Sequence, residues 1–193
     1  ELSRALKSGN LIEAANLQNR SVEFTLFMTL PAAAALFVMS EPIVRLVYER
    51  GAFATNNSTP TVAAILAIFG LGLPAFVLIK AFTPGYFARE DTRTPMVFAA
   101  ISVAVNVVTA LTLFPSMGAP GIAVASAVAG WVNALMLLAM LIRRGHWGRD
   151  IPLLKRIPRL VLAAVVMAVA LYFAQHWLAD RLVRGVPLLV KAT

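Results

Sequence analysis

The chain contains no cysteine among its 193 residues. A disulfide framework and a thiolate metal site are therefore excluded, and the redox compartment is left open. Charge of either sign is absent over residues 94–142, a stretch interrupted only by the segment PSMGAPG at 115–121. An ordinary soluble domain does not contain so long an uncharged run, whereas two membrane-spanning helices of roughly 20 residues each and a tight turn account for it.

Residue groupings that carry catalysis or bind metals are missing as well. The sequence has no glycine-rich phosphate loop and no HExxH motif. Its two histidines, His146 and His176, fall on opposite sides of the membrane in the topology derived below, so they cannot share a metal ion. Glu90 and Asp91 are adjacent, but neighbours on a helix do not face each other, which favours a charged loop over a catalytic carboxylate pair. We therefore expect no catalytic residue, no metal site and no cofactor.

The residues that are present describe a membrane protein. Hydrophobic residues make up 60% of the chain and charged residues only 13%, and the mean hydropathy is +0.79. Soluble domains carry about a quarter charged residues. The formal net charge of +8 could indicate a nucleic-acid partner, but the basic residues lie in short tracts beside apolar runs. We interpret this charge as a topological signal and expect no nucleic-acid binding.

Uncharged apolar runs predict an all-α fold, a polytopic transmembrane bundle over residues 24–179. Residues 1–23 show weaker amphipathicity and are expected to form a cytoplasmic amphipathic connector. Residues 180–193 are expected to form an external loop that could open a further span. The five predicted spans have approximate limits of 24–40, 60–88, 96–114, 119–142 and 160–179.

Lys and Arg are unevenly divided between the two sides of this bundle. Eleven lie in residues 1–23, 89–95 and 143–159, whereas four lie on the opposite side. Because positive residues concentrate on the cytoplasmic side, the amino end of the segment is predicted to be cytoplasmic and loop 41–59 external. In that loop, the segment EPIVRLVYE at 41–49 places its charges on one helical face, which is typical of a short helix on the membrane surface.

The second span is longer than a bilayer requires and contains residues that weaken a helix. Over 60–88, roughly 43 Å of helix would have to tilt, break or extend into the headgroups. Prolines remove backbone donors and glycines loosen the helix, which makes this span the best candidate for a bending element. The hinge candidates are Gly70, Gly72, Pro74 and Pro84.

Three polar residues within the spans are candidates for a substrate cavity. Lys80 is the only formal charge well inside a span, and an unpaired charge is costly in lipid. It could line a hydrated cavity, or its flexible stem could extend toward the cytoplasmic interface. Asn106 and Asn133 lie in the middle of their spans, where hydrogen bonding between helices is the simpler interpretation and a cavity role the alternative.

Several segments together resemble one known family. They are SEPIVRLVYERGAF at 40–53, GLGLPAFVLIK at 70–80 and FAREDTRTP at 87–95, supported by MGAPGIA at 117–123 and WVN at 131–133. In order and spacing they resemble the MurJ/MviN family of bacterial lipid II flippases. This family belongs to the multidrug/oligosaccharidyl-lipid/polysaccharide exporter superfamily. The resemblance covers about residues 1–180.

The resemblance implies a fourteen-helix transporter with two lobes around a central cavity, in which this chain would supply helices nine to thirteen of the C-terminal lobe. Such a protein would move lipid II from the cytoplasmic to the outer leaflet of the bacterial inner membrane by alternating access. Peptidoglycan synthesis, cell-wall biogenesis and cell shape depend on that step. The implied partners are lipid II, membrane lipids and the amino-terminal lobe, which holds most of the family's cations for the diphosphate.

The resemblance also implies that Lys80 and residues of two loops are matching positions of the family. The external loop contributes Glu49, Arg50, Gly51 and Phe53, and the cytoplasmic loop contributes Arg89, Asp91 and Arg93. Residues 160–179 would line part of the hydrophobic groove that accommodates the lipid tail.

Functions of other classes remain open at this point. A drug or ion antiporter of the same superfamily would share the helix plan, but its cation coupling needs acidic membrane residues, and the five spans contain none. Another exporter of polyprenyl-linked saccharides would share both the plan and the chemistry. A non-transporting membrane scaffold is the third alternative, since these five spans cannot enclose a path alone.

Overall fold

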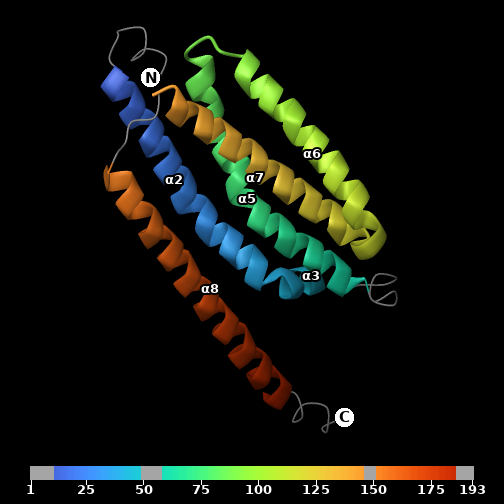
Figure 1. Cartoon of the computed structure of the whole chain (residues 1–193). Helices are drawn as coiled ribbons and strands as arrows, with labels where there is room; N and C mark the ends of the chain where they lie inside the picture. The colour runs from blue at the N-terminus through green and yellow to red at the C-terminus, as the bar shows by residue number, and fades with distance from the viewer. Residues whose placement is uncertain (1–10, 49–57, 146–150, 186–193) are drawn as a thin grey trace.

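The computed structural model describes residues 11–48, 58–145 and 151–185, and all regular secondary structure in these ranges is α-helical (Figure 1). Five of the helices are long and apolar enough to cross a membrane. The sixth, α3, has 9 residues and is too short to do so. The helices are α2 (Leu11–Val38), α3 (Ser40–Tyr48), α5 (Thr59–Phe87), α6 (Arg93–Met117), α7 (Ala119–Arg143) and α8 (Ile151–Gly185).

The long helices pack in an order that differs from their order in the sequence. Helix α6 packs on α7, α7 on α5, α5 on α2, and α2 on α8, while α3 packs against α5 (Figure 1). Helix α5 is therefore flanked by α2 and α7, and α6 and α8 lie at the two edges. We call the end of the bundle with residues 88–92 the Asp91 end, and the end with the α6–α7 turn and α3 the Gly118 end.

Two helices extend beyond the predicted apolar limits. Helix α2 begins at Leu11, so residues 11–23 of the expected connector continue directly into the first span. Helix α8 runs from Ile151 to Gly185, so residues 180–185 are helical where a loop was expected. The physical reason is the same in both helices: no glycine or proline lies in residues 11–30 or 159–184, and polar residues at the ends of a span do not stop a helix.

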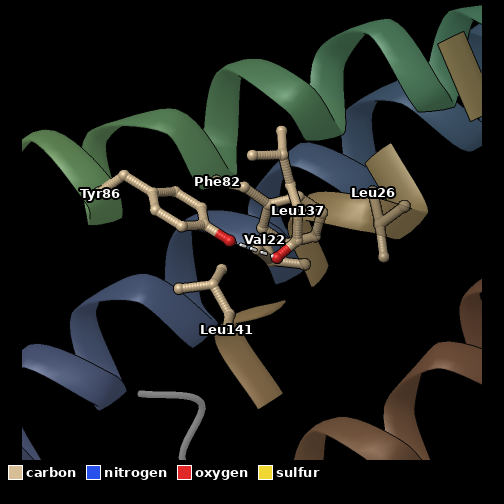
Figure 2. Packing of buried hydrophobic residues seen from close by; sticks show 6 residues of the cluster. All are labelled: Val22, Leu26, Phe82, Tyr86, Leu137 and Leu141. Atoms are coloured by element: carbon tan, nitrogen blue, oxygen red, sulfur yellow. Dashed lines mark hydrogen bonds between the residues drawn. The ribbon is translucent and has the colours of Figure 1, made fainter. Parts of the chain in front are cut away.

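A cluster of buried apolar side chains joins α2, α5 and α7 near the Asp91 end (Figure 2). The Tyr86 hydroxyl donates a hydrogen bond of 2.6 Å to the Leu137 carbonyl within this cluster. A buried phenol needs such a partner, because leaving it unpaired would cost about 1–3 kcal/mol. The bond therefore fixes α5 against α7. The cluster consists of Val22, Leu26, Phe82, Tyr86, Leu137 and Leu141.

Toward the Gly118 end, glycines let α5 and α7 approach closely. A Cβ atom added to Gly72 would lie 3.2 Å from the Cβ of Ala127. A Cβ atom added to Gly130 would lie 2.7 Å from Cε1 of Phe76. Membrane helices associate through this kind of close packing because lipid supplies no hydrophobic drive between them. The two helices are thus held by the cluster of large apolar side chains near the Asp91 end, and by close contacts at small residues farther along the bundle.

Candidate functional site

Lys80 lies on α5 with its side chain exposed at the surface of the bundle. Helix α5 packs against α2, α3 and α7, so the Lys80 side chain points away from these neighbours and not into the core. None of the ion pairs found among the described residues involves Lys80. An unpaired cation on the outside of a membrane helix is costly in lipid. This placement favours a position that faces water or a further part of the protein.

Pro84 leaves a second polar group, the backbone carbonyl of Lys80, without its usual partner on the same helix. It lies one helical turn after Lys80, and its side chain is also exposed. Proline has no N–H, so it cannot donate the backbone hydrogen bond that the Lys80 carbonyl would otherwise receive. The Thr83 hydroxyl donates a hydrogen bond of 2.6 Å to the Ile79 carbonyl, one residue before Lys80. The segment therefore presents an ammonium group and a carbonyl without its usual helical donor.

The hinge candidates lie on a helix that is not broken. Helix α5 is continuous over 29 residues, including Pro74 and Pro84. Gly70, Gly72 and Pro74 are buried, and a Cβ atom on Gly70 would lie 3.1 Å from the Cβ of Leu36. Of the three possibilities for this long span, which were tilting, breaking or extending, the helix is not broken, and close packing of α5 against α2 and α7 supports the segment on both sides. The glycines act here as contact points, and bending would have to displace those contacts.

Asn106 joins two helices by a hydrogen bond. Its Nδ2 donates to the Ser126 hydroxyl at 3.2 Å, and one turn away the Ser102 hydroxyl donates to the Ala129 carbonyl at 2.8 Å. Helix α6 has no buried residue, and these two bonds link its middle to α7. Asn106 therefore has the structural partner that its mid-span position suggested.

Asn133, unlike Asn106, has a buried amide oxygen without a hydrogen-bond partner in the part of the chain that the structure describes. It is 9% exposed, and its Oδ1 atom is buried without a hydrogen-bond partner among the described residues. A buried amide oxygen without a partner costs free energy and calls for a water molecule or another donor. Asn133 lies on α7 within the buried interface of the bundle, apart from the exposed face of Lys80. The structure therefore does not join the three candidates Lys80, Asn106 and Asn133 into one cavity.

The loop at the Asp91 end ties together the ends of three helices. Asp91 accepts hydrogen bonds from the Thr94 amide at 3.0 Å and from the Thr94 hydroxyl at 2.7 Å. Arg144, just after α7, forms an ion pair with Asp91 and donates to the Thr94 hydroxyl at 3.0 Å. Arg89 donates to the Gly85 carbonyl at 2.6 Å, which caps the end of α5. Arg93 is exposed.

Hydrogen bonding and charge both stabilise the ionised form of Asp91. The Thr94 hydroxyl and amide, followed by Arg144, hold the pKa of the Asp91 carboxyl well below its usual range. Burial lowers the pKa of the neighbouring Arg89 guanidinium, whose ordinary value leaves it charged at neutral pH. Asp91 thus works as a charged cap on α6, and its carboxylate is not a general base.

The external motif Glu49, Arg50, Gly51 and Phe53 lies outside the described residues. The neighbouring helix α3 is described, and its Val44 is buried, while Leu46 and Val47 are 78% and 55% exposed. Exposed apolar side chains on a short helix at the end of a bundle suit the membrane surface that the sequence predicted.

Two contacts at the Asp91 end were not visible in the sequence. The Gln18 amide lies so close to Gly85 that a Cβ atom there would be 2.5 Å from both Nε2 and Oε1. Arg156 Nη1 on α8 donates to both carboxylate oxygens of Glu23 on α2, with both distances 2.9 Å. A glycine two residues before the end of a membrane helix was the signal for the first contact. The second joins residues 133 positions apart, which no local pattern marks.

Known proteins match this chain along its whole length. The sequence model of the family described as "Lipid II flippase MurJ" matches residues 1–192. A probable lipid II flippase MurJ from Rhizobium meliloti (strain 1021) is 73% identical over 192 residues, which is 100% of this chain and 36% of the relative. A protein of the same description from Rhizobium tropici is 56% identical over 92% of this chain and 33% of its own length. The chain therefore spans about a third of these relatives.

A solved structure has the same helix arrangement. It is described as lipid II flippase MurJ in an inward closed conformation, and the TM-score is 0.75 at 28% sequence identity. The match covers 90% of this chain and 35% of the solved one. The fold that α2 to α8 form is thus part of a larger transporter fold.

Proposed function

Because this chain belongs to the lipid II flippase MurJ family, we propose that it is a C-terminal part of a transporter that flips lipid II from the cytoplasmic to the outer leaflet of the inner membrane. The observation that carries the proposal is the family match over residues 1–192, on a fold with five candidate membrane spans. Transport would occur without catalysis or a cofactor.

The exposed face of α5 supports a place in alternating access. Lys80 and Pro84 are exposed on α5, away from its contacts with α2, α3 and α7, and we propose that they face the amino-terminal lobe. A central cavity between two lobes would hydrate the Lys80 ammonium and let it attract a diphosphate headgroup. We propose that the chain lies with the Asp91 end in the cytoplasm, since most of its basic residues lie there. Under this topology, loop 49–53 is external and loop 89–93 is cytoplasmic.

Substitution of Lys80 in the full-length transporter tests this function. We expect Lys80→Met to lower the rate of lipid II flipping at least about tenfold, which corresponds to roughly 1.4 kcal/mol, and Lys80→Arg to retain most of the rate because the charge is kept. Lipid II that becomes accessible at the outer leaflet is the measurement, alongside growth of a flippase-depleted strain. Arg20→Met is the matched control, because it removes another exposed cation, on α2 before the predicted apolar run at 24–40. Equal rates for Lys80→Met and wild type would contradict the role of Lys80.

A further inference from the structure

A cavity with four polar lining residues lies between α3, α8 and the end of α2 at the Gly118 end. It has a volume of about 300 Å³. The candidate span in α2 ends at Val38, and the uncharged run of α8 ends just before Asp180, so the cavity lies where the apolar spans end. A ligand of this cavity would therefore sit at the border of the bilayer. The lining residues are Val38, Glu41, Pro42, Arg45, Gln175 and His176.

The two charges of the cavity can reorganise at little cost. Arg45 Nη2 and Glu41 Oε1 are 2.6 Å apart, one helical turn from each other on α3. Their side chains are 59% and 54% exposed. An exposed ion pair of this kind contributes at most about 1 kcal/mol. Both groups are therefore available to a ligand that carries a negative and a positive charge of its own.

Two further groups in the cavity are hydrogen-bond acceptors. Gln175 Oε1 is buried and has no hydrogen-bond partner among the described residues. His176 Nδ1 lies 2.9 Å from the Tyr172 carbonyl. A carbonyl can only accept, so Nδ1 carries the proton and, in the neutral ring, Nε2 is left as an acceptor. Together with the Glu41 carboxylate, the cavity offers three acceptors and a single cation, Arg45.

We propose that this cavity binds the headgroup of a zwitterionic phospholipid with a primary ammonium, the phosphoethanolamine class. The ammonium has three N–H donors, which match Glu41, Gln175 Oε1 and His176 Nε2 in number and sign. The phosphate accepts from the Arg45 guanidinium, which suits phosphate geometry. A choline headgroup has no N–H and leaves Gln175 Oε1 unpaired. An anionic glycerol headgroup places its charge near Glu41 and brings no cation to balance that carboxylate.

Apolar side chains next to the cavity provide a surface for the acyl chains. Phe37 on α2 precedes the cavity residue Val38 and is 49% exposed. Tyr172 and Phe173 on α8 lie about one turn before Gln175 and His176, and they are 50% and 66% exposed. The site therefore combines a polar headgroup pocket with a lipid-facing apolar wall below it, as a bound phospholipid requires.

Lipid retention by the full-length transporter tests the proposal. The protein is equilibrated with equal amounts of phosphatidylethanolamine, phosphatidylcholine and phosphatidylglycerol, and the lipids that remain bound are measured by native mass spectrometry. We expect phosphatidylethanolamine to be retained about tenfold over the other two, the effect of roughly one hydrogen bond to a charged group. Glu41→Gln and Gln175→Leu should each abolish this preference. Soluble phosphoethanolamine in excess should displace the lipid, which shows that the headgroup is recognised.

The control is Glu90→Gln, which removes an exposed carboxylate at the Asp91 end and should leave the preference unchanged. Equal retention of the three lipids, a preference for phosphatidylglycerol, or an undiminished preference in both cavity variants would overturn the proposal. Because the readout is bound lipid and not lipid II transport, the result is independent of the proposed flippase activity.

Discussion

At the scale of single residues, Asp91 shows how one side chain joins distant parts of the chain. The spacing of Asp91 and Thr94 before an apolar run is a helix-start signal that is readable in the sequence. The pairing of Asp91 with Arg144 crosses 53 positions and needed the packing of α6 on α7 to bring the two together. Local hydrogen bonding was therefore predictable from the sequence, whereas the long-range ion pair was not.

Replacement of Asp91 should destabilise the transporter in a pH-dependent way. We expect Asp91→Ala to lower the free energy of unfolding at pH 7 by about 1–2 kcal/mol, because it removes the cap of α6. The pKa of Asp91 is lowered in the folded state, so its contribution is complete above the unfolded value of about 3.9, shrinks as the pH falls below that value, and is lost only as the pH falls through the folded pKa. Thermal unfolding of both proteins between pH 7 and pH 3 measures this difference. A gap that is as large at pH 3 as at pH 7 would argue against the ionised cap, and Asp91→Asn, a good neutral cap, should fall between the two.

Glu90 holds a backbone conformation that normally belongs to glycine. Its φ is 60°, and the Glu90 amide bonds the Phe87 carbonyl while the Asp91 amide bonds the Tyr86 carbonyl. This pair of bonds is the usual end of a helix with glycine in the left-handed position. A side chain there costs about 1–2 kcal/mol. The motif was hidden in the sequence because Glu occupies the position of the expected Gly.

Glu90→Gly should therefore stabilise the transporter, by about 1 kcal/mol after the greater chain entropy of glycine is allowed for. The midpoint of thermal unfolding of the purified full-length protein is the measurement. Glu90→Ala is the matched control and should give no gain, because alanine keeps the Cβ atom that causes the strain. A midpoint that is unchanged or lower for the glycine variant would contradict the strained cap.

At the scale of helices, α5 is both the helix against which α2, α3 and α7 pack and the proposed bending element. Its apolar length predicted a span over 60–88, and the helix observed is Thr59–Phe87. Glycine and proline residues suggested a break, but tight contacts with α2 and α7 keep the helix continuous. Sequence composition reports where a backbone is weak. Whether the backbone bends there depends on the helices packed against it, and the sequence of one helix does not reveal which helices these are.

Two substitutions separate bending from packing in α5. Pro74→Ala restores the backbone donor for the Gly70 carbonyl and should lower lipid II flipping several-fold, with a small change in thermal stability, if this segment bends during transport. Gly72→Leu should lower both, since its side chain would collide with Phe76 and Ala127. The two measurements are the flipping rate in proteoliposomes and the unfolding midpoint. An unchanged rate in Pro74→Ala would remove α5 from the list of bending elements.

At the scale of the whole molecule, uncharged runs were enough to predict five spans, because each span must bury about 20 residues in lipid. The lateral order of the helices was not predictable, since it rests on contacts such as Gly85 with Gln18 and Arg156 with Glu23. The cavity between α3 and α8 was missed for the same reason. Its lining residues come from two segments more than 100 positions apart, and although Glu41 and Arg45 belong to the amphipathic segment 41–49, nothing in that segment points to Gln175 or His176.

The most direct test of the central claim, that this chain is a working part of a lipid II flippase, is a segment exchange. The matching third of the Rhizobium meliloti relative is replaced by residues 1–192 of this chain, to which it is 73% identical. Growth of a strain depleted of its own flippase is then compared with growth on the intact relative. We predict equal growth. A chimaera that reaches the membrane at normal levels and does not support growth would contradict the account.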